Sequence, residues 1–301
     1  MRSEPSKIYS QGMLFQKNNL VVKSYAKINV SLRVLSKRDD GYHELEMVNL
    51  PLELHDAIEI ERVPNAVDTF VTCDDIGLSK THHNLCKKAV DAMRQEYGFK
   101  DNFNIAIHKE IPFAAGLGGG SSNAAAVMMA LVSLLHIKAD PAKLNQIGLS
   151  IGADVPFFLL NKPAYVTGIG EKLQLIPVKK SYNCLIVKPQ KGLSTTDVFA
   201  VADNFERTAI ETQGVLQALA SGDNALLAKS IGNDLYAPAK SLLPEVGKIV
   251  DSLKNDGISI VCMSGSGSSV YALSDDAKLL GKAARKYLDL GYVVRLTKTT
   301  L

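Results

Sequence analysis

The amino-acid sequence predicts an α+β fold. Alternating strand patterns are grouped near the N-terminus, helical patterns mix with strands further along, and 46% of the 301 residues are hydrophobic, which supplies an ample core. The length suits one large or two modest domains. The composition changes near residues 179–181. We therefore expect an N-terminal domain over 20–180 and a C-terminal domain over 181–301, preceded by a mobile tail over 1–19, which has no clear periodicity.

Composition and charge count against several classes of protein. The 34 basic and 31 acidic residues leave a net charge of only +3, and no basic block suggests a nucleic-acid partner. No apolar run is long enough to span a membrane. The cysteines are scattered without metal-ligand spacing or a disulfide framework, so we expect reduced thiols in a cytoplasmic protein. They are Cys73, Cys86, Cys184 and Cys262. Nothing in the sequence indicates an oligomeric state.

Strands are expected first along the chain. Apolar and polar residues alternate over 29–34, which is typical of a half-buried strand, and its backward extension puts Lys27 and Asn29 together on the polar face. An Asp-Asp-Gly turn at 39–41 then leads to strands expected over 42–54, 57–63 and 69–73.

Helices follow these strands. Asn84 and Gly98 are suited to start and stop a helix, and an alternating strand over 103–109 leads into a glycine-rich loop. The apolar run over 124–135 predicts a helix that is buried on nearly every face. A further helix is expected from Asp140 to near residue 152. Asp154 then lies among apolar residues, at a bend, because Pro156 disfavours helix at the residue before it. Residues 164–173 form a strand or a turn.

The C-terminal part mixes both kinds of element. Helices are expected over 195–201, 211–220, 224–231, 244–254 and 275–290, and strands over 185–187, 258–263, 270–273 and 292–297. A second glycine-serine turn, over 264–269, joins two of these strands.

The glycine-rich stretch over 111–126 is the strongest functional signal. Its glycines leave backbone N–H groups unshielded, and a helix start adds free N–H groups and a partial positive charge, so the stretch suits a phosphate. No lysine follows the last glycine, as a Walker A loop requires, and Ser121 stands where a dinucleotide fingerprint has glycine. A flexible linker or a closely packed helix start is the alternative. The buried helix behind the loop argues against a linker, because it would fix the loop's position.

Three separated segments resemble the GHMP small-molecule kinases. Residues 116–125, with Pro112 ahead of them, are similar to that family's phosphate loop, and residues 264–268 resemble its C-terminal glycine motif. Residues 25–29, together with 40–43, 152–156 and 232–235, resemble the branch that phosphorylates a cytidine diphosphate-linked methylerythritol. The resemblance runs from about residue 20 to the end. It departs at Ser24-Tyr25, where that branch is expected to have Ala-Pro.

The resemblance implies a two-domain fold, with an N-terminal mixed α/β domain and a ferredoxin-like C-terminal domain. It implies ATP-dependent phosphorylation of the substrate's 2-hydroxyl in the non-mevalonate route to isoprenoid precursors, with Mg²⁺ expected beside ATP. No clear pair of carboxylate ligands for the metal is visible, and Ser122 is a weak candidate. The residues expected to hold ATP are Pro112, Ala114, Ala115, Gly116, Leu117, Gly118, Gly119, Gly120, Ser121 and Ser122.

The same resemblance assigns catalytic roles to two residues. Asp154 is expected to accept the proton of the substrate hydroxyl, and Lys27 to lie beside it, keep it ionised and ease loss of that proton. From the residues alone, Asp154 is equally well explained as a helix cap or a buried, satisfied carboxylate, and Lys27 as a solvated strand lysine. Asn29, on the same polar face, is expected to hydrogen-bond to the substrate or to one of these groups.

Tyr42, His43 and Phe199 are expected to recognise the cytosine, with the two rings of Tyr42 and Phe199 stacking on it and His43 forming a hydrogen bond. Phe199 is almost equally well explained as a core residue of a helix. Two other functions remain open. One is a GHMP kinase that acts on homoserine, mevalonate or a sugar, and the other is a non-catalytic nucleotide-binding paralogue. The Tyr42-His43 pair and the segment around Asp154 count against the first, and the presence of both Lys27 and Asp154 counts against the second.

Overall fold

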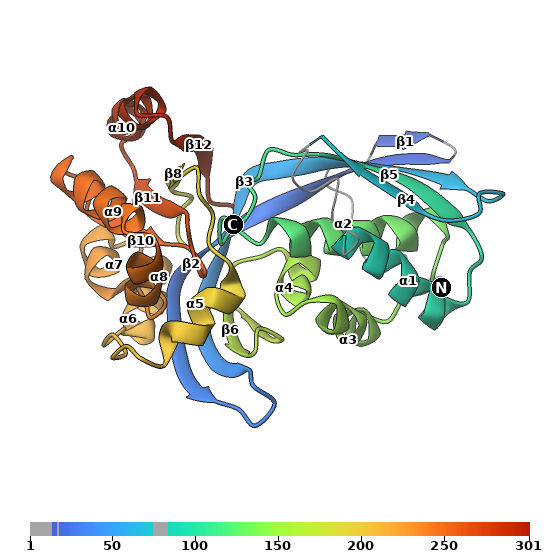
Figure 1. Ribbon diagram of the computed structural model, residues 1–301, viewed down its shortest axis with the longest axis horizontal. Coiled ribbons are helices and arrows are strands. Elements are labelled where there is room, and N and C mark those ends of the chain that lie inside the picture. Colours follow the sequence, from blue (N-terminus) through green and yellow to red (C-terminus); the bar gives the residue numbers. More distant parts are fainter. Residues whose placement is uncertain (1–13, 17, 75–83) are drawn as a thin grey trace.

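The computed structural model describes residues 14–16, 18–74 and 84–301, and its architecture is α+β, as the sequence predicts (Figure 1). The larger sheet contains β1 (Leu14–Gln16), β2 (Asn19–Lys37), β3 (His43–Val63), β4 (Phe70–Cys73), β5 (Asn102–His108), β6 (Ala164–Gly168), β7 (Lys172–Leu175) and β9 (Gly232–Asn233). The smaller sheet contains β8 (Asn183–Lys188), β10 (Ile260–Met263), β11 (Val270–Ser274) and β12 (Val293–Lys298). The helices are α1 (Leu85–Tyr97), α2 (Gly119–Leu134), α3 (Pro141–Ile151), α4 (Val155–Leu160), α5 (Thr195–Ala202), α6 (Thr212–Ser221), α7 (Asn224–Ser230), α8 (Tyr236–Leu242), α9 (Glu245–Asn255) and α10 (Ala277–Asp289).

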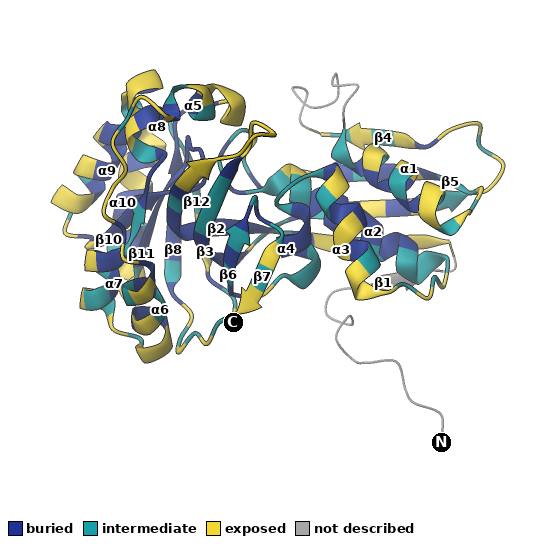
Figure 2. Ribbon diagram, turned by 90° about the horizontal axis from the view of Figure 1, so that it is seen from below, coloured by how far each residue is buried: buried dark blue, intermediate teal, exposed yellow. Residues whose placement is uncertain are grey.

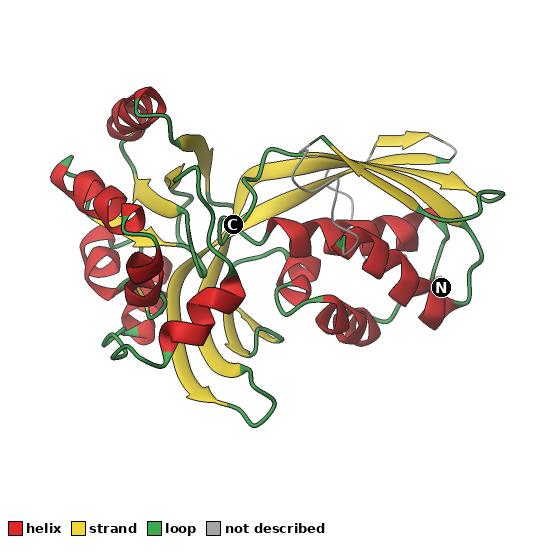
Figure 3. Ribbon diagram, viewed as in Figure 1, coloured by secondary structure: helices red, strands yellow, loops and turns green. Residues whose placement is uncertain are grey.

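A long antiparallel ribbon of β2 and β3 is the centre of the larger sheet. The strand order is β1-β2-β3-β5-β4, with β6 and β7 continuing from β3 and β9 added parallel to β2. Figure 3 shows this ribbon extending between two groups of helices. The ribbon therefore joins the two halves of the molecule.

The ribbon corrects one expectation from the sequence. The alternation predicts a break between residues 54 and 57, but β3 runs without interruption from His43 to Val63. Asp56 lies inside the strand, where its carboxylate is buried and hydrogen-bonded. The β2–β3 register shifts nearby, between Tyr25 and Lys27, so the pattern of alternation changes phase without ending the strand.

The expected N-terminal tail is too long. Residues 14–16 form β1, which pairs with β2, and β2 already begins at Asn19. Leu20 and Val22 are buried in the core, which extends the sheet well before the alternation over 29–34. The rest of the expected tail, residues 1–13 and 17, lies outside the described residues.

Helices α1 to α4 cover one face of the larger sheet (Figure 1). α2 packs between the sheet and the neighbouring helices, and its apolar side chains, including Ala124, Val127, Met128 and Leu131, are buried, as predicted. The helix begins at Gly119 rather than at residue 124, because the small glycine and serine residues of the loop's end continue the helical turn.

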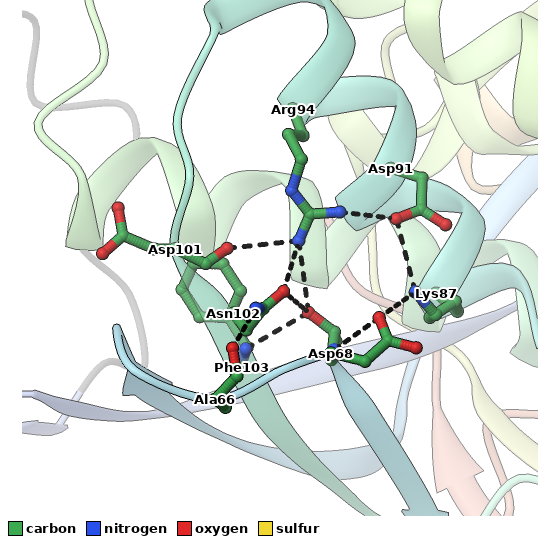
Figure 4. A network of polar contacts seen from close by, with 9 residues as sticks. Ala66, Asp68, Lys87, Asp91, Arg94, Asp101, Asn102 and Phe103 are labelled. Carbon is green, nitrogen blue, oxygen red and sulfur yellow. Dashed lines mark hydrogen bonds and ion pairs between the residues drawn. The ribbon is translucent and has the colours of Figure 1, made fainter.

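A polar network fixes α1 against the edge of the larger sheet (Figure 4). Asn84 and Gly98 cap the helix at its two ends, as predicted. Near its C-terminal end, Arg94 donates hydrogen bonds to the backbone carbonyl of Asp101 and to the side chain of Asn102. These contacts hold α1, and with it the start of the helix at Asn84, in one position on the sheet.

The smaller sheet has the ferredoxin-like connectivity that the resemblance implies. Its antiparallel strands are ordered β10-β11-β8-β12, and helices connect β8 to β10 and β11 to β12. On β8, Leu185 and Val187 face the core beneath α9 and α10, whereas Cys184 and Ile186 face the β2–β3 ribbon and α6. Both faces of β8 are therefore buried, and Figure 2 shows it in the dark interior of the molecule, whereas the edge strand β12 is partly exposed.

A division of the chain at residues 180–181 remains a prediction. The smaller sheet uses residues between 183 and 298, but β9, at residues 232–233, belongs to the larger sheet. Neither β9 nor α8 is expected from the sequence. β9 has only two residues, and α8 contains Pro238, which is unfavourable in most helical positions.

Candidate active site

The glycine-rich loop connects β5 to α2. Gly118 has a left-handed backbone (φ 72°) and precedes the first residue of α2. The N–H group of Ser122 is bonded to the carbonyl of Gly118 at 2.9 Å. The N–H groups of Gly119, Gly120 and Ser121 stand in the first helical turn, where no carbonyl of the helix can accept from them. The loop therefore presents backbone donors at the positive end of a buried helix.

Glycine is required at two points in this loop. A Cβ atom on Gly116 would lie 2.0 Å from the carbonyl oxygen of Ser264, and one on Gly118 would lie 2.5 Å from the ring of Phe158. Both residues also have positive φ angles, which favour glycine. The glycines thus allow the loop to approach the C-terminal glycine motif on one side and α4 on the other.

The C-terminal glycine motif holds the loop by hydrogen bonds. The Ser264 hydroxyl donates to the carbonyl of Gly116 at 2.9 Å, and the Ser269 N–H donates to the carbonyl of Ala115 at 3.2 Å. Asn233 supports the motif by donating its side-chain amide to the carbonyls of Met263 (2.9 Å) and Gly265 (2.8 Å). Two segments about 150 residues apart in sequence therefore form one structural unit.

Lys27, Asn29 and Asp154 lie together below the loop. Lys27 is almost fully buried, and its ammonium donates to the Asn29 side-chain oxygen at 2.7 Å and lies 3.6 Å from an Asp154 carboxylate oxygen. The Lys27 N–H also donates to the carbonyl of Leu117 at 3.1 Å, which ties the strand to the loop. Lys27 is therefore not a solvated strand lysine. The Lys27 ammonium faces the carboxylate of Asp154, whose side chain is 33% exposed.

Asp154 occupies the residue before α4, but it does not cap the helix with its side chain. Its carboxylate instead points to Lys27 and is partly open to the cavity. Pro156 lies in the first turn of α4, where proline is tolerated, so the helix starts at Val155 rather than after the proline. The Asp154 carboxylate therefore forms no hydrogen bond to the backbone at the start of α4.

Tyr42, His43 and Phe199 meet at the turn of the β2–β3 ribbon and α5. The rings of His43 and Phe199 lie 5.3 Å apart at 31°, and Tyr42 is 58% exposed. The His43 Nε2 atom is 3.1 Å from a carboxylate oxygen of Asp203, and this hydrogen bond lowers the pKa of the Asp203 carboxyl below its usual value. Phe199 is therefore partly buried against His43 rather than enclosed in the core.

One cavity of about 1100 Å³ contains these groups. The sequence-predicted residues that line it are Lys27, Asn29, Tyr42, His43, Pro112, Ala114, Ala115, Gly116, Leu117, Gly118, Gly119, Gly120, Ser121, Asp154 and Phe199. The side chains of Ala115 and Leu117 are buried in the core, so these two residues offer their backbone to the cavity.

Ser122 is the exception among the predicted residues. Its side chain is buried and does not line the cavity, its hydroxyl is hydrogen-bonded to that of Ser24 at 2.8 Å, and its N–H is used within the helix. The expectation that Ser122 contacts ATP or a metal is therefore not supported. Ser24, where the sequence departs from the branch it resembles, is the partner that engages it.

Several supporting residues of the site are not expected from the sequence. Asp203 contacts His43, Thr195 and Ser266 share a hydrogen bond of 2.8 Å at the cavity wall, and Asp56 lies under the loop. Asp203 and Asp56 belong to no recognisable local motif, because each acts on a segment distant in sequence. Thr195 and Ser266 do carry a signal, because Thr195 begins the helix predicted over 195–201 and Ser266 lies in the glycine motif over 264–268.

Family comparison agrees with the fold and the site. The model of the GHMP kinase N-terminal domain matches residues 84–162, and the model of the C-terminal domain matches residues 215–292. The first match contains the glycine-rich loop and Asp154, and the second contains Asn233 and the glycine motif. The fold and the two family matches together define an ATP-dependent small-molecule kinase.

Relatives that match over nearly their whole length identify the branch of the kinase family to which the chain belongs. A 4-diphosphocytidyl-2-C-methyl-D-erythritol kinase of Caldanaerobacter subterraneus subsp. tengcongensis is 37% identical over 93% of this chain and 96% of its own length. One of a Geobacillus species is 36% identical over 92% and 96%. The chain belongs to the GHMP kinase family, in the branch of the 4-diphosphocytidyl-2-C-methyl-D-erythritol kinases.

Solved structures agree with this placement. The crystal structure of a 4-(cytidine 5'-diphospho)-2C-methyl-D-erythritol kinase superposes with a TM-score of 0.76 at 29% identity, covering 93% of this chain and 99% of that one. A homoserine kinase from Cytophaga hutchinsonii superposes with a TM-score of 0.75 at 18% identity, covering 96% and 98%, and shows the shared fold alone. Within the described residues, no helix has the length and apolar character needed to cross a membrane.

Proposed function

We propose that this enzyme transfers the γ-phosphoryl group of ATP to the 2-hydroxyl of 4-diphosphocytidyl-2-C-methyl-D-erythritol. The observation that supports this most directly is a single cavity with three chemically distinct parts. The glycine-rich loop offers backbone donors for phosphate, Lys27 and Asp154 form a charged pair, and Tyr42, His43 and Phe199 offer aromatic surface for a base. We also propose the cytoplasm as its location, on the evidence of the scattered cysteines.

The glycine-rich loop is suited to the phosphates of ATP. The N–H groups in the first turn of α2 point to a cavity wall without side-chain bulk, and they are held there by the C-terminal motif. Because phosphoryl transfer depends mainly on positioning and charge stabilisation, a rigid set of donors contributes directly to the rate.

Asp154 and Lys27 are suited to activate the alcohol. Asp154 takes the proton from the 2-hydroxyl, and the hydroxyl oxygen forms a bond to the γ-phosphorus while the bond from that phosphorus to the β–γ bridging oxygen breaks, which releases ADP. The Lys27 ammonium, 3.6 Å from the Asp154 carboxylate, stabilises negative charge that develops on the attacking oxygen. Asn29 holds this ammonium in place through the 2.7 Å hydrogen bond.

Mg²⁺ fits the donors that the cavity offers. Ser121 offers a hydroxyl at its wall, a hard oxygen ligand of the kind that Mg²⁺ prefers, and phosphate oxygens and water would complete the shell. Among the described residues, no group of three or more His, Cys, Asp or Glu side chains is arranged to hold a metal by itself. When bound with ATP, the ion neutralises phosphate charge.

The aromatic end of the cavity is suited to the cytosine. Tyr42 is exposed and available for stacking, and His43 and Phe199 pack against each other in a more buried part of the cavity wall. A base stacked on such side chains gains about 1–3 kcal/mol for each contact. Lys27 and Asp154 would then meet the alcohol between the base and the phosphate loop.

An ADP-release assay with ATP, Mg²⁺ and the cytidyl substrate tests the proposal. We expect turnover in the wild type and a loss of at least about a thousandfold in Asp154→Ala, with ADP affinity unchanged within about twofold, because the base acts on the alcohol and not on the nucleotide. Full activity of the variant would remove Asp154 from the mechanism.

A substrate panel separates the alternatives. Phosphorylation of homoserine, mevalonate or a sugar, with none of the cytidyl substrate, would assign a different GHMP kinase activity. ADP binding without turnover on any substrate would indicate a non-catalytic paralogue.

A further inference from the structure

Asp56 is a fully buried carboxylate beneath the glycine-rich loop, and the mechanism above does not use it. One of its oxygens, Oδ1, accepts hydrogen bonds from the backbone N–H groups of Glu110 (2.9 Å) and Ile111 (2.8 Å). The other, Oδ2, accepts from the side-chain amide of Asn123 at 3.0 Å and from the ammonium of Lys109. The two oxygens therefore have separate partners.

These partners come from the two ends of the loop. Lys109, Glu110 and Ile111 precede the glycines, and Asn123 follows them in the first turns of α2. A buried carboxylate is costly unless it is paired and hydrogen-bonded, and Asp56 meets that cost with four donors. The consequence is that one side chain of β3 holds the entry and the exit of the loop at a set separation.

The contacts of Asp56 also reach the donors that face the cavity. Lys109 and Asn123 both line the cavity, and a Cβ atom on Gly119 would lie 3.3 Å from the Lys109 nitrogen. Gly119 is the first residue of α2, so the Lys109 ammonium lies beside the free N–H groups of the helix start. Moving Lys109 or Asn123 would change the position and charge of the surface that receives phosphate.

We propose that Asp56 is a positioning residue for the nucleotide. It fixes the spacing of the loop's backbone donors through Oδ1, and through Oδ2 it holds Lys109 and the start of α2 in register with them. The inference rests on the proposed function in one respect, which is that the glycine-rich loop binds the phosphates of a nucleotide. It is independent of which alcohol is phosphorylated.

Asp56→Asn tests the proposal, because an amide of the same shape offers one acceptor oxygen instead of two. It can keep the backbone contacts of Oδ1 or the side-chain contacts of Oδ2, but not both sets. We expect the Kd for ADP, measured by calorimetry, and the KM for ATP to rise about tenfold, with the KM for the cytidyl substrate unchanged within about twofold.

Asp101→Asn is the matched control. Asp101 forms an ion pair with Arg62 at 2.7 Å, in the same half of the molecule but away from the loop, and its side chain is only 15% exposed. This variant should lower Tm and leave the Kd for ADP and both KM values unchanged. An Asp56→Asn protein that binds ADP as tightly as the wild type would overturn the proposal, and so would an equal rise in the KM values of both substrates.

Asn123→Ala covers the case in which Asp56→Asn does not fold. It removes one partner of Oδ2 and keeps the carboxylate, so we expect a rise of about threefold in the Kd for ADP. No change in that Kd would overturn the proposal. If the wild type binds ADP but does not phosphorylate the cytidyl substrate, the proposed function fails while the role of Asp56 is still decided by these measurements.

Discussion

Single residues in the glycine-rich loop are constrained in different ways. Gly118 combines a positive φ angle with a position against the ring of Phe158, and its Cβ would also lie 3.4 Å from Lys27 Cε. Gly98, at the end of α1, has almost the same φ angle, but a Cβ atom placed on it would have no neighbouring atom within 4 Å. A comparison of the two glycines therefore separates the effect of backbone strain, which both positions share, from the effect of steric crowding, which only Gly118 has.

Gly118→Ala should impair the enzyme beyond the effect of strain. The left-handed backbone costs about 1–2 kcal/mol for alanine at either position, so Gly118→Ala and Gly98→Ala should share that loss of stability. Only Gly118→Ala should also lower kcat/KM for ATP, by roughly ten- to a hundredfold, because the added carbon displaces Phe158 or the loop itself. Denaturation curves and steady-state kinetics on both variants measure this, and equal kcat/KM values would contradict it.

The residue scale also shows what the sequence can and cannot reveal about the site. Lys27, Asp154 and the glycines stand in local motifs, and the resemblance of these motifs to a known family is what predicted their grouping in one cavity. Asp203 and Asp56 stand in no motif, because each is defined by a partner far along the chain. The burial of the Ser122 side chain was not predictable for a related reason, since its hydroxyl is hydrogen-bonded to Ser24 of β2, far away in the sequence.

At the level of elements, Glu46 of β3 connects three neighbours. Its carboxylate accepts hydrogen bonds from Arg33 of β2, Tyr165 of β6 and Thr212 of α6. Burial raises the pKa of the Glu46 carboxyl, but the hydrogen bonds from these three side chains outweigh it, so its pKa lies below the ordinary value of 4.5. The ionised carboxylate therefore stabilises the packing of the ribbon against β6 and α6.

The contribution of the Glu46 carboxylate to the free energy of unfolding should appear as a pH-dependent difference between Glu46→Gln and the wild type. A carboxyl whose pKa is depressed by folding adds stability above its unfolded pKa and loses it as the pH falls through the folded pKa. The variant should be about 1–2 kcal/mol less stable at neutral pH, and the difference should shrink well below pH 4.5. Urea unfolding at both pH values tests this, with Glu61→Gln, an exposed carboxylate of β3, as the control. A difference that does not change with pH would contradict it.

The helices and strands were predictable where a local signal marks them. Asn84 and Gly98 for α1, and Asp140 for α3, are capping residues whose effect does not depend on the rest of the fold. The continuity of β3 through Asp56 was not predictable, because a buried carboxylate is tolerated only when distant donors reach it. β9 exists only because Ser31 and Leu32 of β2 pair with it.

The whole molecule brings many separate segments of the chain to one cavity. β2 supplies Lys27, and β3 supplies His43 at its first residue. The glycine-rich loop supplies backbone donors, the residue before α4 supplies a carboxylate, and α5 and the C-terminal motif close the wall. The aromatic residues lie at the ribbon turn and α5, whereas Asn84 and Leu85 lie at the start of α1, on the side of the phosphate loop. The two substrates should therefore depend on different parts of the fold.

His43→Ala tests this division of the cavity. Loss of the ring removes the wall beside Phe199, so the KM for the cytidyl substrate should rise about tenfold, while the KM for ATP and the Kd for ADP stay within about twofold. His55→Ala is the matched control, because His55 lies on the same strand, packs on Tyr25 and does not line the cavity. A rise in the KM for ATP instead would mean that the nucleotide occupies the aromatic end. The glycine-rich loop would then bind the cytidyl substrate, and the two substrates would occupy exchanged positions on either side of the Lys27–Asp154 pair.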